Sequence, residues 1–277
     1  MKRPTFHPQL SPRRDTRHAR RRRGFTLVEL LTVSGIFGIL LTVGFSVVVR
    51  ARIKALSTIS AANLRALASA NLMYANDHGG RFCPAQDKAN LNRWHGSRPS
   101  LNSPYDPNSG YLSPYLEDGG KARVCPVFLM YQQSAQTFES GAGGYGYNAA
   151  YIGGTPESPY IPELLSRVRN PSRTIMFTDA ALPRSDGVQE YPYCEPYNSV
   201  NPDGSLGGGL SPSVHFRHDG LAHVAWCDGA VTAEPPARFG GRNLYGGDGL
   251  LYQIGWLGPS ANNGWWNARS DANDPPN

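Results

Sequence analysis

One apolar segment near the N-terminus constrains this chain more than any other feature. The 25 residues Phe25–Val49 contain a single charge, Glu29, and lie between the arginine run Arg20–Arg23 and the basic segment Arg50–Lys54. A helix of that length rises roughly 37 Å, which exceeds the roughly 30 Å hydrocarbon core of a bilayer. The segment therefore predicts one membrane-spanning helix.

The basic residues are concentrated before this segment. Residues 1–24 hold nine of the 27 lysines and arginines and one of the 21 acidic residues, which leaves 18 basic and 20 acidic residues in the rest of the chain. By the positive-inside rule, this basic leader stays in the cytoplasm and the chain from residue 50 onward lies outside. Because that remainder is mildly acidic, we expect no nucleic-acid partner; a basic arm that folds onto DNA is the alternative.

Three kinds of N-terminal signal compete for this region. A cleaved secretory signal has an apolar region of about 7–15 residues followed by a small-residue cleavage site, and this segment is longer and lacks such a site. A twin-arginine signal fits the outline of Arg22–Leu27, but it also requires a cleavage site after the apolar region. The third kind keeps the apolar segment in the mature protein and is cleaved before it.

The third kind has a specific counterpart in residues 24–30. Their sequence, GFTLVEL, resembles the type IV prepilin signal residue for residue. The resemblance implies that prepilin peptidase cleaves between Gly24 and Phe25, that Phe25 is then N-methylated, and that Glu29 is the acid at the fifth position of the mature chain. It also implies a pilin-like or pseudopilin subunit, whose partners are prepilin peptidase, itself, other pseudopilins and inner-membrane lipid.

The glutamate requires a physical reason, because an ionised carboxylate inside a membrane span costs about 2.5–3.5 kcal/mol on insertion scales. Cleavage after Gly24 creates an amine at Phe25, about one helical turn from Glu29, and a neighbouring subunit offers a second amine. We expect Glu29 to pair with such an amine when helices pack side by side, so that the charge directs assembly. An acid that stays solvated near the interface is the alternative.

The helix is expected to continue outside the membrane over residues 50–78, which contain no glycine or proline. A narrow face with steps of three and four residues predicts an amphipathic helix that packs on the globular part of the same chain. Its members are Ile53, Leu56, Ser60, Leu64, Leu67, Asn71 and Tyr74. Gly79 and Gly80 are expected to end the helix.

Residues 79–266 are expected to form a globular β-rich domain, with residues 267–277 as a disordered tail. Short apolar runs between turn signals predict a loop-rich antiparallel sheet. These runs are Arg123–Met130, Tyr145–Ile152, Arg173–Phe177, Val214–Arg217, His223–Cys227 and Leu250–Leu257, and Ile161–Arg169 is expected to form a short helix or turn. The fold class is therefore α+β: a long N-terminal helix, half in the membrane, packed on a small antiparallel β-sheet in a pilin-like manner.

Residues 214–231 predict a three-stranded meander with tight turns at Asp219-Gly220 and Asp228-Gly229. The spacing from His218 to Asp228-Gly229 resembles the C-terminal H-X9-DG element of prepilin-like proteins of planctomycete and verrucomicrobial type, although Ala230 stands where that group often has a histidine. Other pieces that resemble the same group are Tyr74–Asp77, Pro114–Leu116, Val124–Pro126, Tyr145–Asn148 and Pro171–Ile175.

The histidines of this element have two interpretations. We expect His218 to hydrogen-bond the Asp228 turn and to stabilise the hairpins, with no bound metal. The alternative is a metal site made by His215, His218, His223 and Asp228, which are close in sequence. A single acid at Asp248 is too little to predict calcium.

The four cysteines, Cys83, Cys125, Cys194 and Cys227, all fall in the part placed in an oxidising compartment. Of the three possible pairings we favour Cys83–Cys125 and Cys194–Cys227, from their order in the chain and the matching Cys-Pro contexts. Free thiols in the core are the alternative.

The chain contains none of the common catalytic or nucleotide-binding motifs, so we expect no enzymatic activity and no cofactor. The glycine-dense residues 141–146 are interpreted as a loop, and the tyrosines and tryptophans as core, with sugar stacking as the alternative. The predicted function is a pseudopilin that the peptidase processes and that polymerises through its helix into a periplasmic fibre of a type II secretion-like system. Two alternatives remain: a periplasmic binding protein or enzyme that uses the signal only as an anchor, and a soluble twin-arginine substrate.

Overall fold

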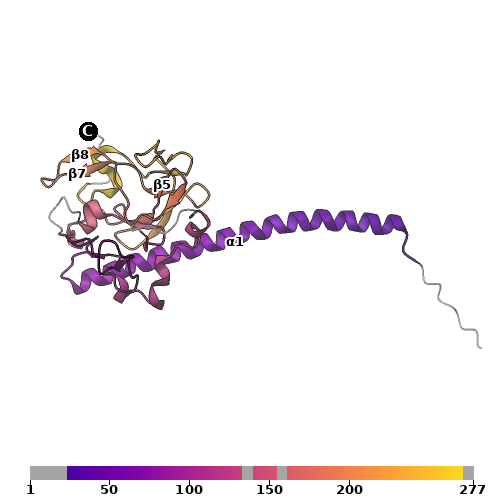
Figure 1. Cartoon of the computed structure of the whole chain (residues 1–277), viewed down its shortest axis with the longest axis horizontal. Helices are drawn as coiled ribbons and strands as arrows, with labels where there is room; N and C mark the ends of the chain where they lie inside the picture. Colours follow the sequence, from indigo (N-terminus) through magenta and orange to yellow (C-terminus); the bar gives the residue numbers. More distant parts are fainter. Residues whose placement is uncertain (1–23, 133–139, 155–160, 271–277) are drawn as a thin grey trace, which may run out of the picture. The chain divides into compact units, whose positions relative to one another are not determined.

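The computed structural model describes residues 24–132, 140–154 and 161–270. The chain divides into two units, Met1–Arg50 and Ala51–Asn277. The long helix α1 (Leu27–Asp77) contributes its N-terminal half to the first unit and its C-terminal half to the second (Figure 1). Most of the predicted leader, residues 1–23, lies outside the described residues.

The N-terminal half of α1 has no covered face. Residues 27–45 and 47–50 are exposed, and the apolar side chains among them include Leu27 at 81% and Phe45 at 74%. By length and composition, α1 is the one helix in the described part of the chain that could cross a membrane. The long N-terminal helix predicted from the sequence is confirmed.

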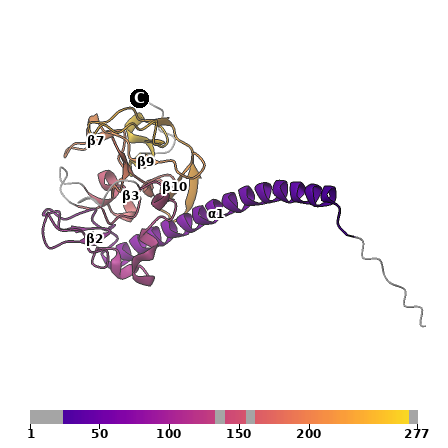
Figure 2. The ribbon, with the colours of Figure 1, turned by 45° about the vertical axis from the view of Figure 1, so that its right-hand side comes forward.

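In the second unit, the C-terminal half of α1 runs along one side of the β-structure, as both views show (Figures 1 and 2). The predicted stripe is the packed face: Ser60, Leu64, Leu67 and Asn71 are fully buried, and Ile53, Leu56 and Tyr74 are partly buried. Apolar packing supplies most of the stability of such a helix, because propensity alone is weak.

The two polar members of the stripe are hydrogen-bonded to two buried tyrosines. Ser60 Oγ lies 3.0 Å from the hydroxyl of Tyr145, and Asn71 Nδ2 donates to the hydroxyl of Tyr147 over 3.0 Å. Tyr147 in turn donates to the carbonyl of Cys83 over 2.9 Å. Because a buried polar group is costly without a partner, these bonds favour one register of the helix on the sheet.

The helix ends where the sequence predicted. Gly79 has a φ of +64°, which a residue with a Cβ rarely adopts, and the N–H of Gly80 donates to the carbonyl of Ala75 over 2.8 Å. This is the 6→1 hydrogen bond of a Schellman motif, which turns the chain away from the helix axis.

In the described part of the chain, the β-structure consists of short antiparallel strands in five sheets, which confirms the predicted α+β class. The largest sheet has the order β11 (Val231–Glu234), β10 (Ala222–Trp226), β4 (Ile175–Asp179), β3 (Tyr145–Tyr147). The second has the order β12 (Arg238–Phe239), β13 (Ile254–Trp256), β9 (Val214–His215). The pairs are β1 (Asn92–Arg93) with β2 (Gly96–Ser97), β5 (Leu182–Arg184) with β6 (Gly187–Gln189), and β7 (Asn198–Val200) with β8 (Leu206–Gly209).

Short helical turns connect these strands. The 3₁₀ turns are η1 (Ser113–Tyr115), η2 (Asp118–Arg123), η3 (Phe128–Met130), η5 (Leu165–Arg167) and η6 (Ala261–Trp266), and η4 (Ala149–Gly153) is a π-turn. The turn η5 lies inside the segment predicted as a short helix or turn.

The strands β4 and β10 are buried on both faces, so the largest sheet separates two apolar clusters. One cluster contains the stalk residues Leu64 and Leu67 with Tyr145 and Tyr147. The other contains Trp226, Trp256 and Trp266 with the second sheet. The core is therefore formed between the helix and the sheet and again between the two sheets.

Two predicted strands are wrong in whole or in part. Arg123–Met130 forms turns instead of a strand, because Pro126 has no N–H for a sheet ladder. Only the first three residues of Tyr145–Ile152 form a strand, because the side chain of Asn148 accepts from the N–H of Tyr151 and caps the π-turn η4.

The predicted meander is correct only in its second half. β10 and β11 form the hairpin at Asp228-Gly229, but β9 pairs with β13 in the other sheet. The Asp219-Gly220 turn does form, with φ of +54° and +81°, and joins His218 to Leu221.

The prediction of a disordered tail is wrong for its first four residues, 267–270. Ala268 is fully buried, and its carbonyl accepts from the N–H of Arg169 over 2.9 Å, so residues 267–270 belong to the packed unit. Residues 271–277 lie outside the described residues.

The packing of the stalk yields a stability prediction. Leu67→Ala is expected to lower the free energy of unfolding by about 2–5 kcal/mol, because it leaves a cavity at a fully buried position. The control on the same helix is Ile59→Ala, at 49% exposure, with an expected change within about 1 kcal/mol. Denaturant unfolding of the full chain in detergent, followed by near-UV circular dichroism, measures both, and equal losses would contradict the packed face.

Candidate functional site

The predicted cleavage site lies immediately before the start of α1. Gly24 and Phe25 are both exposed, Phe25 to 81%, and a Cβ at Gly24 would meet nothing within 4 Å. A peptidase therefore meets an accessible, non-helical backbone at the bond between them. This geometry is compatible with cleavage there, which stays a prediction.

Thr26 and Glu29 form a capping box at the start of α1. The N–H and the hydroxyl of Thr26 each lie 2.9 Å from Glu29 Oε2, and the N–H of Glu29 donates to Thr26 Oγ1 over 3.2 Å. These bonds satisfy N–H groups that a helix end leaves without a partner. In the uncleaved chain, Glu29 thus has a local partner in Thr26. Thr26 directly follows Phe25, where cleavage would create an amine.

The second site is a buried charged cluster around Asp179, the last residue of β4. Arg217 Nη2 donates to Asp179 Oδ1 over 2.6 Å, and both side chains are fully buried. The same guanidinium donates to the carbonyls of Gly144 and Ala180. Burial alone would raise the pKa of the Asp179 carboxyl, but the positive charges of Arg217 and His218 outweigh burial and hold it well below its ordinary value.

Two stacked histidines contact the other oxygen of this carboxylate. Asp179 Oδ2 accepts from the backbone N–H of His223 over 2.7 Å and lies 3.1 Å from Nε2 of His218. The two imidazole rings stack with centroids 3.9 Å apart. Burial would lower the pKa of His218, but the Asp179 carboxylate reverses this and raises it to about 9. For His223 burial wins, and its pKa falls to about 4.

Cys125 completes the cluster from the loop between η2 and η3. Its sulfur lies 3.2 Å from Ser60 Oγ on α1. Burial would raise the pKa of this thiol, but Arg217 and His218 outweigh burial and lower it to about 7. Ligand atoms of Cys125, Asp179 and His218 all lie within 4.8 Å of one another.

The H-X9-DG residues do not make the contact expected of them. Asp228 accepts from the N–H of Ala230 over 2.9 Å in an exposed turn, and Gly229 has a φ of +87°. His218 lies at Asp179 instead, so the expected bond from His218 to the Asp228 turn is wrong. The alternative metal site is also not formed, because His215 packs its ring against Tyr131, with centroids 5.1 Å apart. Among the described residues, the set that could hold a metal consists of Cys125, Asp179 and His218.

The expected disulfides are also wrong. Cys83, Cys125, Cys194 and Cys227 are all buried free thiols. Cys194 packs in the tryptophan-rich cluster and the other three pack in the cluster around the stalk. The alternative of free core thiols is the one observed.

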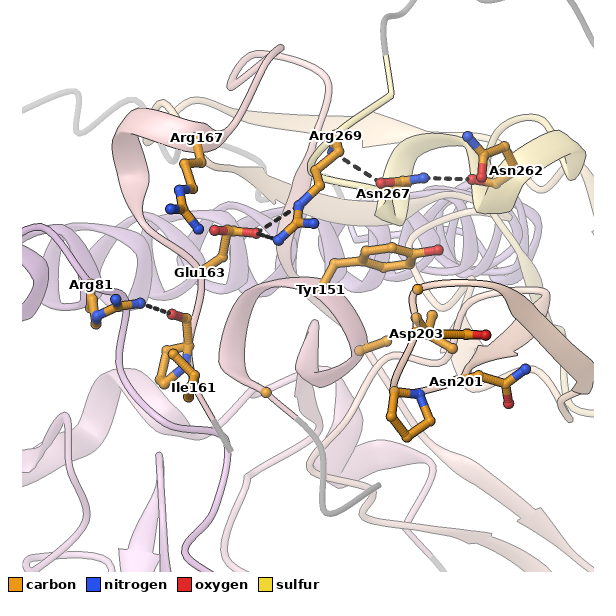
Figure 3. A pocket seen from close by; sticks show the side chains of 16 residues that line it. Arg81, Tyr151, Ile161, Glu163, Arg167, Asn201, Asp203, Asn262, Asn267 and Arg269 are labelled. Atoms are coloured by element: carbon orange, nitrogen blue, oxygen red, sulfur yellow. Dashed lines mark hydrogen bonds and ion pairs between the residues drawn. The ribbon is translucent and has the colours of Figure 1, made fainter. Parts of the chain in front are cut away.

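A polar pocket of about 550 Å³ lies elsewhere on the second unit (Figure 3). One ion pair lies in its wall, with Arg269 Nη2 3.0 Å from Glu163 Oε2, and Arg81 Nη1 donates to the carbonyl of Pro162 over 3.0 Å. The side chains of Tyr151 and Asn267 also line it. The described residues of this wall form a polar surface.

Asp248 is a turn residue. Its Oδ1 accepts from the N–H of Leu250 over 2.9 Å and from that of Leu251 over 3.3 Å. The carboxylate provides a hydrogen-bond acceptor for two backbone N–H groups of its own turn. This contact accounts for an acidic residue at this position without a bound ion.

Sequence reasoning missed Asp179, Arg217 and Cys125 as members of one cluster. A usable signal exists for Asp179, because it interrupts the apolar run from Ile175 to Leu182. A charge in a buried run needs a partner, which is the same argument that singled out Glu29. The identity of the partner depends on which strands pair, and local patterns do not encode that.

Comparisons with known proteins support the N-terminal part of this interpretation. A family model described as a prokaryotic N-terminal methylation motif matches residues 19–45. The searches matched the chain to no curated protein and no solved structure. The prepilin-type signal supports a membrane-anchored, pilin-like protein and implies processing by prepilin peptidase.

The cluster yields a prediction that distinguishes Asp179, which belongs to it, from Asp228, which lies outside it in an exposed turn. Asp179→Asn is expected to destabilise the protein by about 3–5 kcal/mol, because it leaves the Arg217 charge buried without its counter-ion. Asp228→Asn is the matched control; it keeps an oxygen for the N–H of Ala230 and is expected to cost within about 1 kcal/mol. Thermal unfolding of the full chain measures both, and the reverse order would restore the role that the sequence assigned to Asp228.

Proposed function

We propose that this protein is a pseudopilin that assembles through its N-terminal helix into a periplasmic fibre of a type II secretion-like system. The observation that carries the proposal is the prepilin-type signal at residues 19–45, followed by an apolar helix. The protein acts mechanically, as a structural subunit and without an enzymatic reaction.

The exposure of the first half of α1 supports this proposal. Its apolar side chains between Leu27 and Val49 are exposed and are covered by none of the described residues of their own unit. Lipid covers them before assembly, and neighbouring helices cover part of them afterwards. Van der Waals packing between such helices is one of the forces that drives association in a membrane.

Glu29 supplies the specificity of this packing. Among the described residues, its carboxylate accepts from Thr26. Cleavage before Phe25 adds an ammonium group at the start of the helix, and a neighbouring subunit presents another. Pairing a charge that costs about 2.5–3.5 kcal/mol in a span corresponds to roughly a hundredfold in association. The paired register is therefore favoured over all others.

The second unit then lies in the periplasm, where its surface meets other subunits or cargo. The leader, with nine basic residues against one acidic residue, is retained on the cytoplasmic side of the inner membrane. The protein crosses the membrane once.

The proposal predicts separate effects on processing and assembly. Glu29→Ala is expected to leave cleavage largely intact, with methylated Phe25 as the first residue, and to weaken assembly roughly a hundredfold. Ser34→Ala, in the same exposed segment of α1, is the matched control and is expected to assemble normally. N-terminal sequencing measures the first effect, and crosslinking between membrane helices with fibre yield measures the second.

Two outcomes would contradict the proposal. A mature protein that retains residues 1–24 excludes processing. Normal fibres from Glu29→Ala exclude the role of the carboxylate in assembly. If an unrelated membrane helix in place of residues 25–49 preserves the protein's function, the segment is only an anchor, and the tethered binding protein or enzyme is the correct alternative.

A further inference from the structure

We propose that Cys125, Asp179 and His218 form a binding site for a divalent transition-metal ion of the zinc class. One ligand atom from each residue lies within 4.8 Å of the other two. Tetrahedral ligands at about 2.0–2.3 Å from one zinc ion lie about 3.3–3.8 Å apart, so the more distant donors need to move closer by about 1 Å to close the site. The proposal is independent of the assembly function of the N-terminal helix.

The three donors are of types that zinc accepts. A thiolate sulfur, an imidazole nitrogen and a carboxylate oxygen are all zinc ligands, and soft sulfur selects against magnesium and calcium. The three residues come from separate parts of the chain: the loop after η2, the end of β4 and the turn before β10. The fold already brings these three parts together, and a shared ion would link them.

Each histidine has a buried ring nitrogen without a hydrogen-bond partner among the described residues. For His218, whose side chain is 3% exposed, this nitrogen is Nδ1, whereas Nε2 lies 3.1 Å from Asp179 Oδ2. Nδ1 of His223, whose side chain is 10% exposed, also has no hydrogen-bond partner among the described residues. Native proteins contain few such atoms, so each requires an explanation. A metal ion on His218 supplies one.

Arg217 is compatible with a bound cation. Its guanidinium binds Asp179 Oδ1, which leaves Oδ2 of the same carboxylate on the side of His218.

A cavity of about 300 Å³ gives the cluster an entry path. His218 and His223 form part of its wall, and Ser57, Thr58 and Asp219 lie around it. Water from this cavity can complete a tetrahedral site that has three protein ligands, the arrangement that leaves one position open.

The test uses the full-length protein in detergent, stripped with a chelator, reduced, and titrated with CoCl₂. We expect one cobalt ion per chain, with a thiolate-to-cobalt charge-transfer band that ZnCl₂ removes. Cys125→Ser is expected to lose the band, and His218→Gln to weaken cobalt binding at least about tenfold. Cys227→Ser, which removes a buried thiol outside the cluster, is the matched control and keeps the band.

Circular dichroism of each variant establishes that it is folded. If Cys125→Ser does not fold, the thiolate-to-cobalt bands of the wild type and of Cys227→Ser test the proposal. Absence of a stoichiometric thiolate band in the wild type overturns the proposal, and so does a band that Cys227→Ser abolishes. Unchanged cobalt binding in folded His218→Gln also overturns it.

Discussion

The packing of the globular unit depends on how the Asp179 carboxylate is satisfied. A carboxylate in a fully buried position costs several kcal/mol in lost hydration, and it is tolerated only with excellent partners. Here one oxygen accepts from Arg217 and the other from the backbone of His223. Arg217 also donates to Gly144, directly before β3. The carboxylate therefore links β3, β4, β10 and the segment after β9, and these can be satisfied together only in the observed arrangement.

Glu29 is the other acid in an apolar run, and it also needs hydrogen-bond donors for its carboxylate, but it obtains them locally. Glu29 is satisfied within four residues, by Thr26 in a capping box, and this contact can be predicted from the Thr-x-x-Glu spacing. Asp179 is satisfied by residues 38 to 44 positions away. The local solution is an exposed capping contact at a helix end, whereas the distant one fixes a core.

The contrast explains how much the sequence could predict. Periodicity and composition were sufficient for the helix, its packed stripe and its end at Gly79, because these depend on neighbours within one or two turns. The α+β class followed from the short apolar runs between turn signals that come after the long helix. The pairing of β9 with β13 was not predictable, because a two-residue strand carries almost no pattern. The partner of His218 was missed for the same reason, since it depends on the placement of β4 beside β10.

The four free thiols follow from the same dependence on tertiary structure. The exchange that forms a disulfide requires a thiolate with access to its partner. Burial raises the pKa of Cys83 and of Cys227, and both side chains are fully enclosed. Cys125 has a lowered pKa, so enclosure beneath Ser60 and the stalk helix is what protects it. These thiols stay enclosed only while the stalk stays packed, so the hydrophobic contact of α1 with the sheet also protects the chemistry of the core.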